Sequence, residues 1–196
     1  MKPRWPLAPV LATWLCCAVL AWTAAWSGAV MAVEPAAAKA TPTPSELAQP
    51  EWTWRGKDRF TYFGFEVYDA TLWTSPGFEP TAAHEHELAL ELQYLRNFEA
   101  KDIAQRSIQE MRRIAKPSTG QEQAWMAQML RVFPNIRKGD RLLGVQRPGQ
   151  AAVFWHNGQL RGEIADPEFA KLFFGIWLSP RTSAPAFRAR LLGLAP

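Results

Sequence analysis

Residues 86–114, HELALELQYLRNFEAKDIAQRSIQEMRRI, indicate the fold class because the spacing of their apolar side chains changes part-way along the segment. Over residues 88–94 apolar and polar residues alternate, a pattern typical of a half-buried antiparallel strand. Over residues 100–114 apolar residues recur every three or four positions, and charged residues such as Arg106 and Glu110 fall on the other side. The segment therefore predicts a strand followed by an amphipathic helix.

Strand patterns also lie on both sides of this segment. Residues 58–74, DRFTYFGFEVYDATLWT, are rich in aromatic and β-branched side chains and predict two strands joined near Tyr68-Asp69, or one long bent strand. Residues 140–164 contain two turn signals, Arg147-Pro148-Gly149-Gln150 and Asn157-Gly158. They predict a three-stranded meander.

Three further helices are expected from their start and stop signals. They run from about Glu122 to Phe133, from Asp166-Pro167-Glu168 to Pro180, and from Ala184 to Leu192 after Thr182 or Ser183. The predicted order is three strands, two helices, three strands and two helices. This order predicts an α+β fold, an antiparallel β-sheet covered on one face by a layer of helices in an open-faced β-sandwich.

The N-terminal region has the pattern of an export signal. Two basic residues precede the uncharged, apolar residues 5–33, and small side chains occupy Val30 and Ala32. We predict a signal peptide over residues 1–32, cleaved after Ala32, and a periplasmic or secreted protein. An uncleaved anchor is the alternative, because about 20 apolar residues can span a bilayer.

The predicted mature chain begins with a flexible linker rich in Ala, Pro and Thr over residues 33–50, followed by one domain over residues 51–196. Both cysteines, Cys16 and Cys17, lie within the predicted signal peptide. This placement excludes cysteine catalysis and thiolate metal sites from the mature chain. We expect no cofactor and no metal.

The charge balance of the chain limits the classes of partner molecule that we expect. The chain has 22 basic and 18 acidic residues, a formal net charge of +4, and two of the basic residues lie in the predicted signal peptide. The remainder, 20 minus 18, is +2 and evenly mixed, which does not favour nucleic acid or an anionic membrane surface as the main partner. No stable membrane insertion is expected after signal cleavage.

Candidate site residues are few, since the sequence has no phosphate loop, nucleophile elbow or metalloprotease motif. Arg59 could face an apolar cavity and bind an anionic group, or face solvent and pair with a local carboxylate such as Asp69. Thr61 and Tyr94 are possible hydroxyl partners of a ligand. The segment His84-Glu85-His86-Glu87 can bind a metal, but a solvated polar segment is the simpler interpretation.

Several segments together resemble the chalcone isomerase-like family of exported bacterial proteins. They are VYDATLW (67–73), KGD (138–140) and FFGIWLSP (173–180), and the resemblance extends over nearly all of residues 59–193. It implies an antiparallel sheet with a helical layer and a cleft between them. In plant enzymes of this fold the cleft closes a chalcone to a flavanone, with an Arg that binds the phenolate and Thr and Tyr hydroxyls that polarise the ketone. Other relatives bind fatty acids without catalysis.

The resemblance implies a ligand site, but this sequence matches only some of the site residues of the plant enzymes. Arg59 is the best counterpart of the phenolate-binding Arg, and Phe63 or Thr61 takes the place of the Thr, depending on the alignment. Phe98-Glu99 stands where the catalytic Tyr is expected. Each lost oxyanion donor costs about 3 kcal/mol of transition-state stabilisation. We therefore assign no catalytic residue.

The predicted ligand-binding set is Arg59, Thr61, Phe63 and Tyr94. The favoured function is an exported protein that binds an apolar or amphipathic small molecule with an acidic head group, such as a fatty acid, with little or no chalcone isomerase activity. The alternatives are an intramolecular lyase with an unknown substrate, and a non-catalytic structural or interaction protein whose cleft is filled by aromatic side chains.

Overall fold

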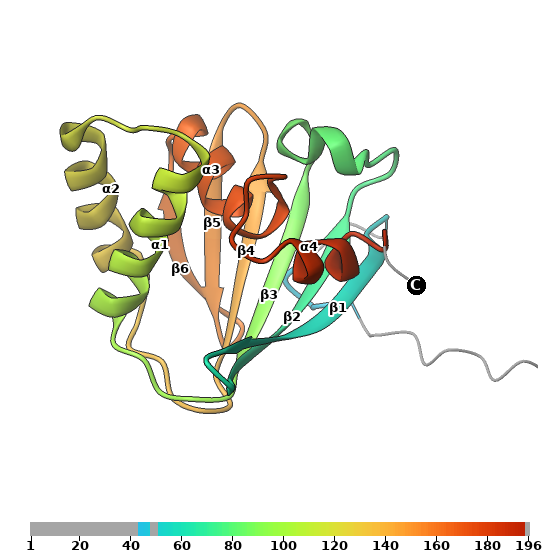
Figure 1. Cartoon of the computed structure of the whole chain (residues 1–196), viewed down its shortest axis with the longest axis horizontal. Coiled ribbons are helices and arrows are strands. Elements are labelled where there is room, and N and C mark those ends of the chain that lie inside the picture. The colour runs from blue at the N-terminus through green and yellow to red at the C-terminus, as the bar shows by residue number, and fades with distance from the viewer. Residues whose placement is uncertain (1–42, 48–50, 195–196) are drawn as a thin grey trace, which may run out of the picture. The chain divides into compact units, whose positions relative to one another are not determined.

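The computed structural model describes residues 43–47 and 51–194. The predicted signal peptide, its cleavage site and most of the predicted linker lie outside the described residues. The sheet has six strands in sequence order, each antiparallel to the next (Figure 1). They are β1 (Thr53–Tyr62), β2 (Phe65–Thr74), β3 (Leu88–Tyr94), β4 (Arg141–Arg147), β5 (Ala151–His156) and β6 (Gln159–Ile164).

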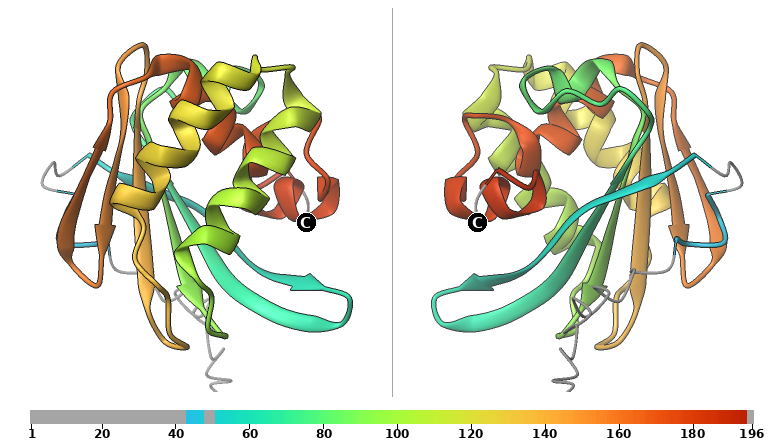
Figure 2. Two further views of the ribbon diagram at one scale, coloured as in Figure 1. Left: turned by 90° about the vertical axis from the view of Figure 1, so that its left-hand side faces the viewer. Right: turned by 90° about the vertical axis from the view of Figure 1, so that its right-hand side faces the viewer.

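The helices lie on one side of the curved sheet (Figure 2). They are the 3₁₀-helix η1 (Pro80–Glu85) and the α-helices α1 (Ala100–Ile114), α2 (Thr119–Val132), α3 (Pro167–Leu178) and α4 (Pro185–Leu191). The order of strands and α-helices is the predicted one, and the α+β fold class is confirmed. Within the described residues, none of these helices has the length and apolar composition needed to cross a bilayer.

The first hairpin turns at a different place from the one predicted. β1 and β2 are joined at Phe63 and Gly64, which both have positive φ angles of 47° and 78°. Tyr68 instead lies inside β2, where it pairs with Phe60 on one side and Tyr94 on the other. The prediction near Tyr68-Asp69 was wrong because Gly64, which readily adopts a positive φ, was the stronger turn signal.

Helix α3 is the centre of the core between the sheet and the helices. It begins as predicted, because the Asp166 side chain accepts hydrogen bonds from the backbone N–H groups of Glu168 and Phe169, both at 3.0 Å. The centre of the Phe173 ring lies 5.3–5.8 Å from the centres of five other aromatic rings. These rings belong to Phe133, Phe154, Phe169, Phe174 and Trp177.

The opposite face of the sheet carries a smaller buried cluster that includes Trp73, Leu143 and Val145. Leu47, from the predicted linker, is 8% exposed and packs into this cluster. Its neighbour Glu46 forms an ion pair with Arg141 of β4. This part of the predicted linker is therefore packed against the sheet, because apolar side chains on that face also need cover.

Candidate ligand-binding cavity

A cavity of about 320 Å³ lies between the sheet and the helices. Strands β1 to β4 form one wall, α1 forms a second, and α3 with the segment leading into α4 forms a third. Most of the lining is apolar, including Phe60, Leu92, Ile103, Phe173 and Phe187. This volume falls within the range of about 300–1,000 Å³ typical of small-molecule sites.

Two tyrosine hydroxyls contribute polar groups to the cavity. The Trp177 Nε1–H group donates a hydrogen bond to the Tyr68 hydroxyl at 2.9 Å, and the Tyr94 hydroxyl has no hydrogen-bond partner within the described part of the chain. Burial raises the pKa of both hydroxyls well above their usual range. Both groups are therefore protonated at neutral pH and can donate to a ligand.

A cation lies at the rim of the cavity on α1. The Arg106 guanidinium is 4.8 Å from the centre of the Tyr62 ring, and its Nη1 atom donates to the Tyr62 hydroxyl at 3.3 Å. Its Nη2 atom lies 2.7 Å from Glu110 Oε1, and Glu110 Oε2 lies 3.3 Å from Arg113 Nε. The Arg106 side chain remains 45% exposed, so it presents positive charge where the cavity meets solvent.

Glu110 corrects the sequence prediction for α1. The sequence predicts Glu110 on the solvent side of the helix, but Glu110 is 6% exposed and lines the cavity together with Arg106. Its spacing of seven residues from Ile103 puts it on the same face of the helix, and this spacing was the available signal. Residue type is the misleading signal here, because carboxylates usually face solvent.

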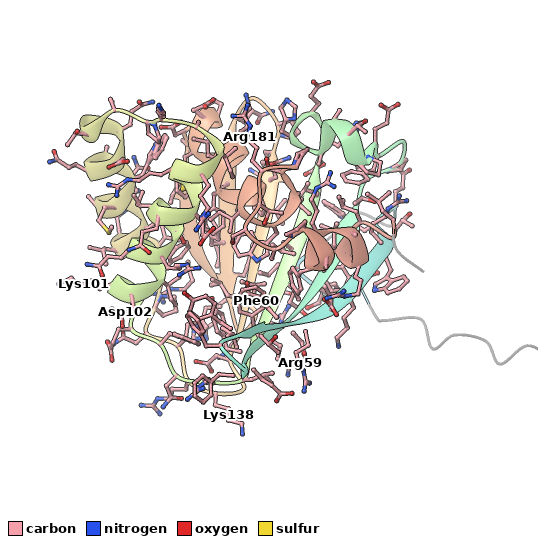
Figure 3. All side chains as sticks on the ribbon, in the orientation of Figure 1. Arg59, Phe60, Lys101, Asp102, Lys138 and Arg181 are labelled. Atoms are coloured by element: carbon pink, nitrogen blue, oxygen red, sulfur yellow. The ribbon has the colours of Figure 1, made fainter. Side chains whose placement is uncertain are left out.

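Arg59 does not face the cavity. Antiparallel pairing places Arg59 opposite Asp69 and Phe60 opposite Tyr68, and neighbouring residues of a strand point to opposite faces. Figure 3 shows Arg59 and Phe60 on opposite sides of β1. Arg59 Nε lies 2.7 Å from Asp69 Oδ1, and Arg59 Nη1 lies 2.6 Å from Glu66 Oε1. The hydrogen bonds that Arg59 donates to the Asp69 and Glu66 carboxylates raise the pKa of Arg59.

The chain matches the chalcone isomerase-like family over residues 55–193. It belongs to that family. A Haemophilus influenzae relative described as an uncharacterized protein is 28% identical over 142 residues, which are 72% of this chain and 68% of the relative. A solved structure, a fatty-acid binding protein of Arabidopsis thaliana, aligns with a TM-score of 0.53 at 8% identity, over 72% of this chain and 84% of that one. The structural likeness supports the fold.

Of the four predicted ligand-binding residues in this chalcone isomerase-like chain, Tyr94 lines the cavity. Thr61 shares the outer face with Arg59, and Phe63 is 84% exposed at the hairpin turn. The structure therefore brings Tyr94 together with Tyr68, Tyr62 and Arg106, and not with the other three predicted residues.

The histidines of this chalcone isomerase-like chain lie away from the cavity. His84 Nε2 lies 3.6 Å from the Glu85 carboxylate, and His156 Nε2 lies 3.2 Å from the Asp140 carboxylate. Among the residues that the structure describes, no three His, Cys, Asp or Glu side chains gather closely enough to hold a metal ion.

Proposed function

We propose that this chalcone isomerase-like protein binds an apolar small molecule with an acidic head group, such as a fatty acid, in the cavity between sheet and helices. The observation that carries the proposal is an apolar cavity of about 320 Å³ with hydrogen-bond donors from Tyr68, Tyr94 and Arg106. A structural neighbour described as a fatty-acid binding protein supports it. The predicted signal peptide supports a periplasmic site of action.

The arrangement suggests how such a ligand lies. The hydrocarbon part fits against Phe60, Ile103 and Phe173, and the acidic group fits near Arg106 and the two tyrosine hydroxyls. A carboxylate that is buried without partners is costly, whereas donors from a guanidinium and neutral phenols compensate its lost hydration. The half-exposed Arg106 also allows part of the head group to stay in water.

Arg106→Ala is expected to weaken the binding of dodecanoic acid at least about tenfold, because a charge-assisted hydrogen bond contributes about 1.5–3 kcal/mol. Isothermal titration calorimetry measures the change, with Arg59→Ala as the matched control. Arg59 lies on the opposite face of the sheet, so its loss should leave the affinity unchanged. Equal effects of the two substitutions would contradict the proposed head-group position.

A second test of the proposed function uses protein isolated from a periplasmic extract. Native mass spectrometry of that sample shows whether it begins after Ala32 and whether it retains an acidic amphiphile. Protein that is absent from the periplasm would contradict export. Protein that stays empty after incubation with fatty acids would contradict the proposed binding function.

Glu110→Gln is expected to tighten the binding of dodecanoic acid about fivefold, a gain of about 1 kcal/mol, because the acid no longer meets a carboxylate that already engages Arg106. Binding of dodecanol, which has no charge, should change much less. The control is Glu122→Gln, which removes an Arg112 ion pair outside the cavity. Unchanged or weaker binding of the acid by the Glu110 variant, with folding retained, would contradict the expected repulsion between the head group and Glu110.

Intramolecular lyase activity is the second candidate, and the two tyrosine hydroxyls of the cavity favour it. The Tyr68 and Tyr94 ring centres lie 5.8 Å apart, and both hydroxyls are protonated donors. Two such donors can stabilise an oxyanion that develops on a bound carbonyl. Turnover of a chalcone that falls in Tyr94→Phe while binding is retained would support this activity over simple binding.

A further inference from the structure

The end of the β1–β2 hairpin exposes three aromatic side chains, which we name the aromatic tip. Tyr62, Phe63 and Phe65 are 44%, 84% and 59% exposed. Figure 2 shows this hairpin extending away from the body of the domain. Large apolar side chains gathered at one exposed point commonly mark a surface that contacts another apolar phase.

The geometry of the β1–β2 turn does not require an aromatic residue. Phe63 occupies the first turn position with a φ of 47°, and Gly64 follows with a φ of 78°. Asn, Asp and Gly are the residues that favour the first position of such a turn, and a bulky side chain with positive φ is strained there. The backbone of Phe63 is strained, and its side chain is 84% exposed, so this residue contributes little to the stability of the fold. Its presence at the turn therefore favours a functional role.

One basic side chain contacts Phe65 of the aromatic tip, and two others lie in the loop that leads into β4. The Arg96 guanidinium lies 4.6 Å from the centre of the Phe65 ring, and the neighbouring loop is held by the Lys138 N–H group, which donates to Asn97 Oδ1 at 2.8 Å. Lys138 projects from this end of the domain (Figure 3). Arg96, Arg137 and Lys138 form no ion pair within residues 43–47 and 51–194.

The carboxylates at this end only partly offset these cations. Glu66 is paired with Arg59, and Asp140 accepts hydrogen bonds from the Arg137 N–H group and from Asn157. Glu99 and Asp102, at the start of α1, form no ion pair among the described residues. The cations without an ion pair, Arg96, Lys101, Arg137 and Lys138, outnumber these two carboxylates and leave a local excess of positive charge. The small net charge of the whole chain conceals this excess.

The aromatic tip is continuous with the rim of the cavity. Tyr62 belongs to both, since it lines the cavity and its hydroxyl accepts a hydrogen bond from Arg106.

We propose that the aromatic tip docks peripherally on an anionic lipid bilayer, with Phe63 and Phe65 in the interface and Arg96, Arg137 and Lys138 at the phosphates. Exposed aromatic rings beside cations are the composition that binds this interface. The proposal rests on the proposed function, for which docking lets an apolar ligand reach the cavity without crossing water.

Phe63→Asn tests the docking without endangering the fold, because Asn suits the turn better than Phe. Partition of the full chain onto phosphatidylcholine vesicles that contain phosphatidylglycerol should fall at least about tenfold, as expected when a buried Phe is lost from the interface. Leu160→Asn is the matched control, since Leu160 is 64% exposed on β6 at the other edge of the sheet. Its partition should equal that of the unchanged protein.

A second measurement locates the contact even if residues outside the described domain also bind lipid. Amides of residues 61–66 should exchange more slowly with deuterium when anionic vesicles are added, and this protection should weaken with salt and disappear in Phe63→Asn. Unchanged exchange at these amides, or equal partition of the Phe63 and Leu160 variants, would overturn the proposal.

The result of the docking experiment can be distinguished from the result of the ligand-binding experiment. Dodecanoic acid supplied from solution should bind Phe63→Asn as it binds the unchanged protein, so a failure of docking leaves the binding result intact. If Phe63→Asn instead converts a dimer into a monomer with no change in partition, the aromatic tip is a contact between copies of this chain and the bilayer proposal is wrong.

Discussion

Phe173→Ala is expected to lower the free energy of unfolding by about 3–5 kcal/mol, among the largest effects of a single substitution. Phe173 is 5% exposed, and its ring contacts five other aromatic rings from β5, α3 and the end of α2. The surrounding rings cannot all move to fill the space, so the variant loses both burial and packing. Chemical denaturation followed by circular dichroism measures the loss.

Phe65→Ala is the control for this prediction. Phe65 is 59% exposed, and its described partner is the Arg96 guanidinium, so its removal should lower the free energy of unfolding by about 1 kcal/mol or less. Because Phe173 also lines the cavity, its truncation enlarges the binding space. A loss below about 2 kcal/mol for Phe173→Ala would show that the core collapses around the site or that the aromatic cluster is less tightly packed.

Gly56→Ala is expected to destabilise the domain by about 3 kcal/mol, at the upper end of the range for overpacking. A Cβ at this position of β1 would lie 2.4 Å from the Leu191 carbonyl oxygen and 2.5 Å from that of Arg190. These atoms belong to the backbone of α4 and cannot rotate away as a side chain would. The helix must therefore shift from β1, and with it Phe187, which lines the cavity.

Gly120→Ala is the matched control for the glycine. Apart from its chain neighbours and the backbone of its own helix, no described atom lies within 4 Å of a Cβ built at Gly120, in the first turn of α2. This substitution should leave the free energy of unfolding unchanged or raise it by about 0.4–1 kcal/mol, since it restricts the unfolded chain. Denaturation curves of the two variants that coincide would contradict the close approach of α4 to β1.

The order of elements could be predicted because periodicity and turn chemistry are local properties. The alternation in residues 88–94 and the helical spacing in residues 100–114 correspond to β3 and α1. Asp166 caps α3 as its position before Pro167 suggested, and the predicted Asn157-Gly158 turn has φ angles of 49° and 86°. The family resemblance implied the same layered arrangement that this order predicts, and the structure confirms it.

The faces of the strands could not be predicted in the same way, because they depend on the turn and on bulges. One step along β1 from Phe60 to Thr61 corresponds to two steps along β2 from Tyr68 to Glu66. This irregularity leaves Val67 without a register partner and places it in the lining of the cavity. A sequence pattern with a period of two cannot show such an insertion.

The sequence by itself determined the fold class, the order of the elements and the family, since each follows from residues that are neighbours in the chain. Only the tertiary structure decided the binding site. Arg59 is held on the outer face by Glu66 and Asp69, whereas Tyr68, Tyr94 and Arg106 meet because β2, β3 and α1 pack around one cavity. The physical reason is that the direction of a side chain depends on strand register and helix packing, which join residues far apart in the sequence.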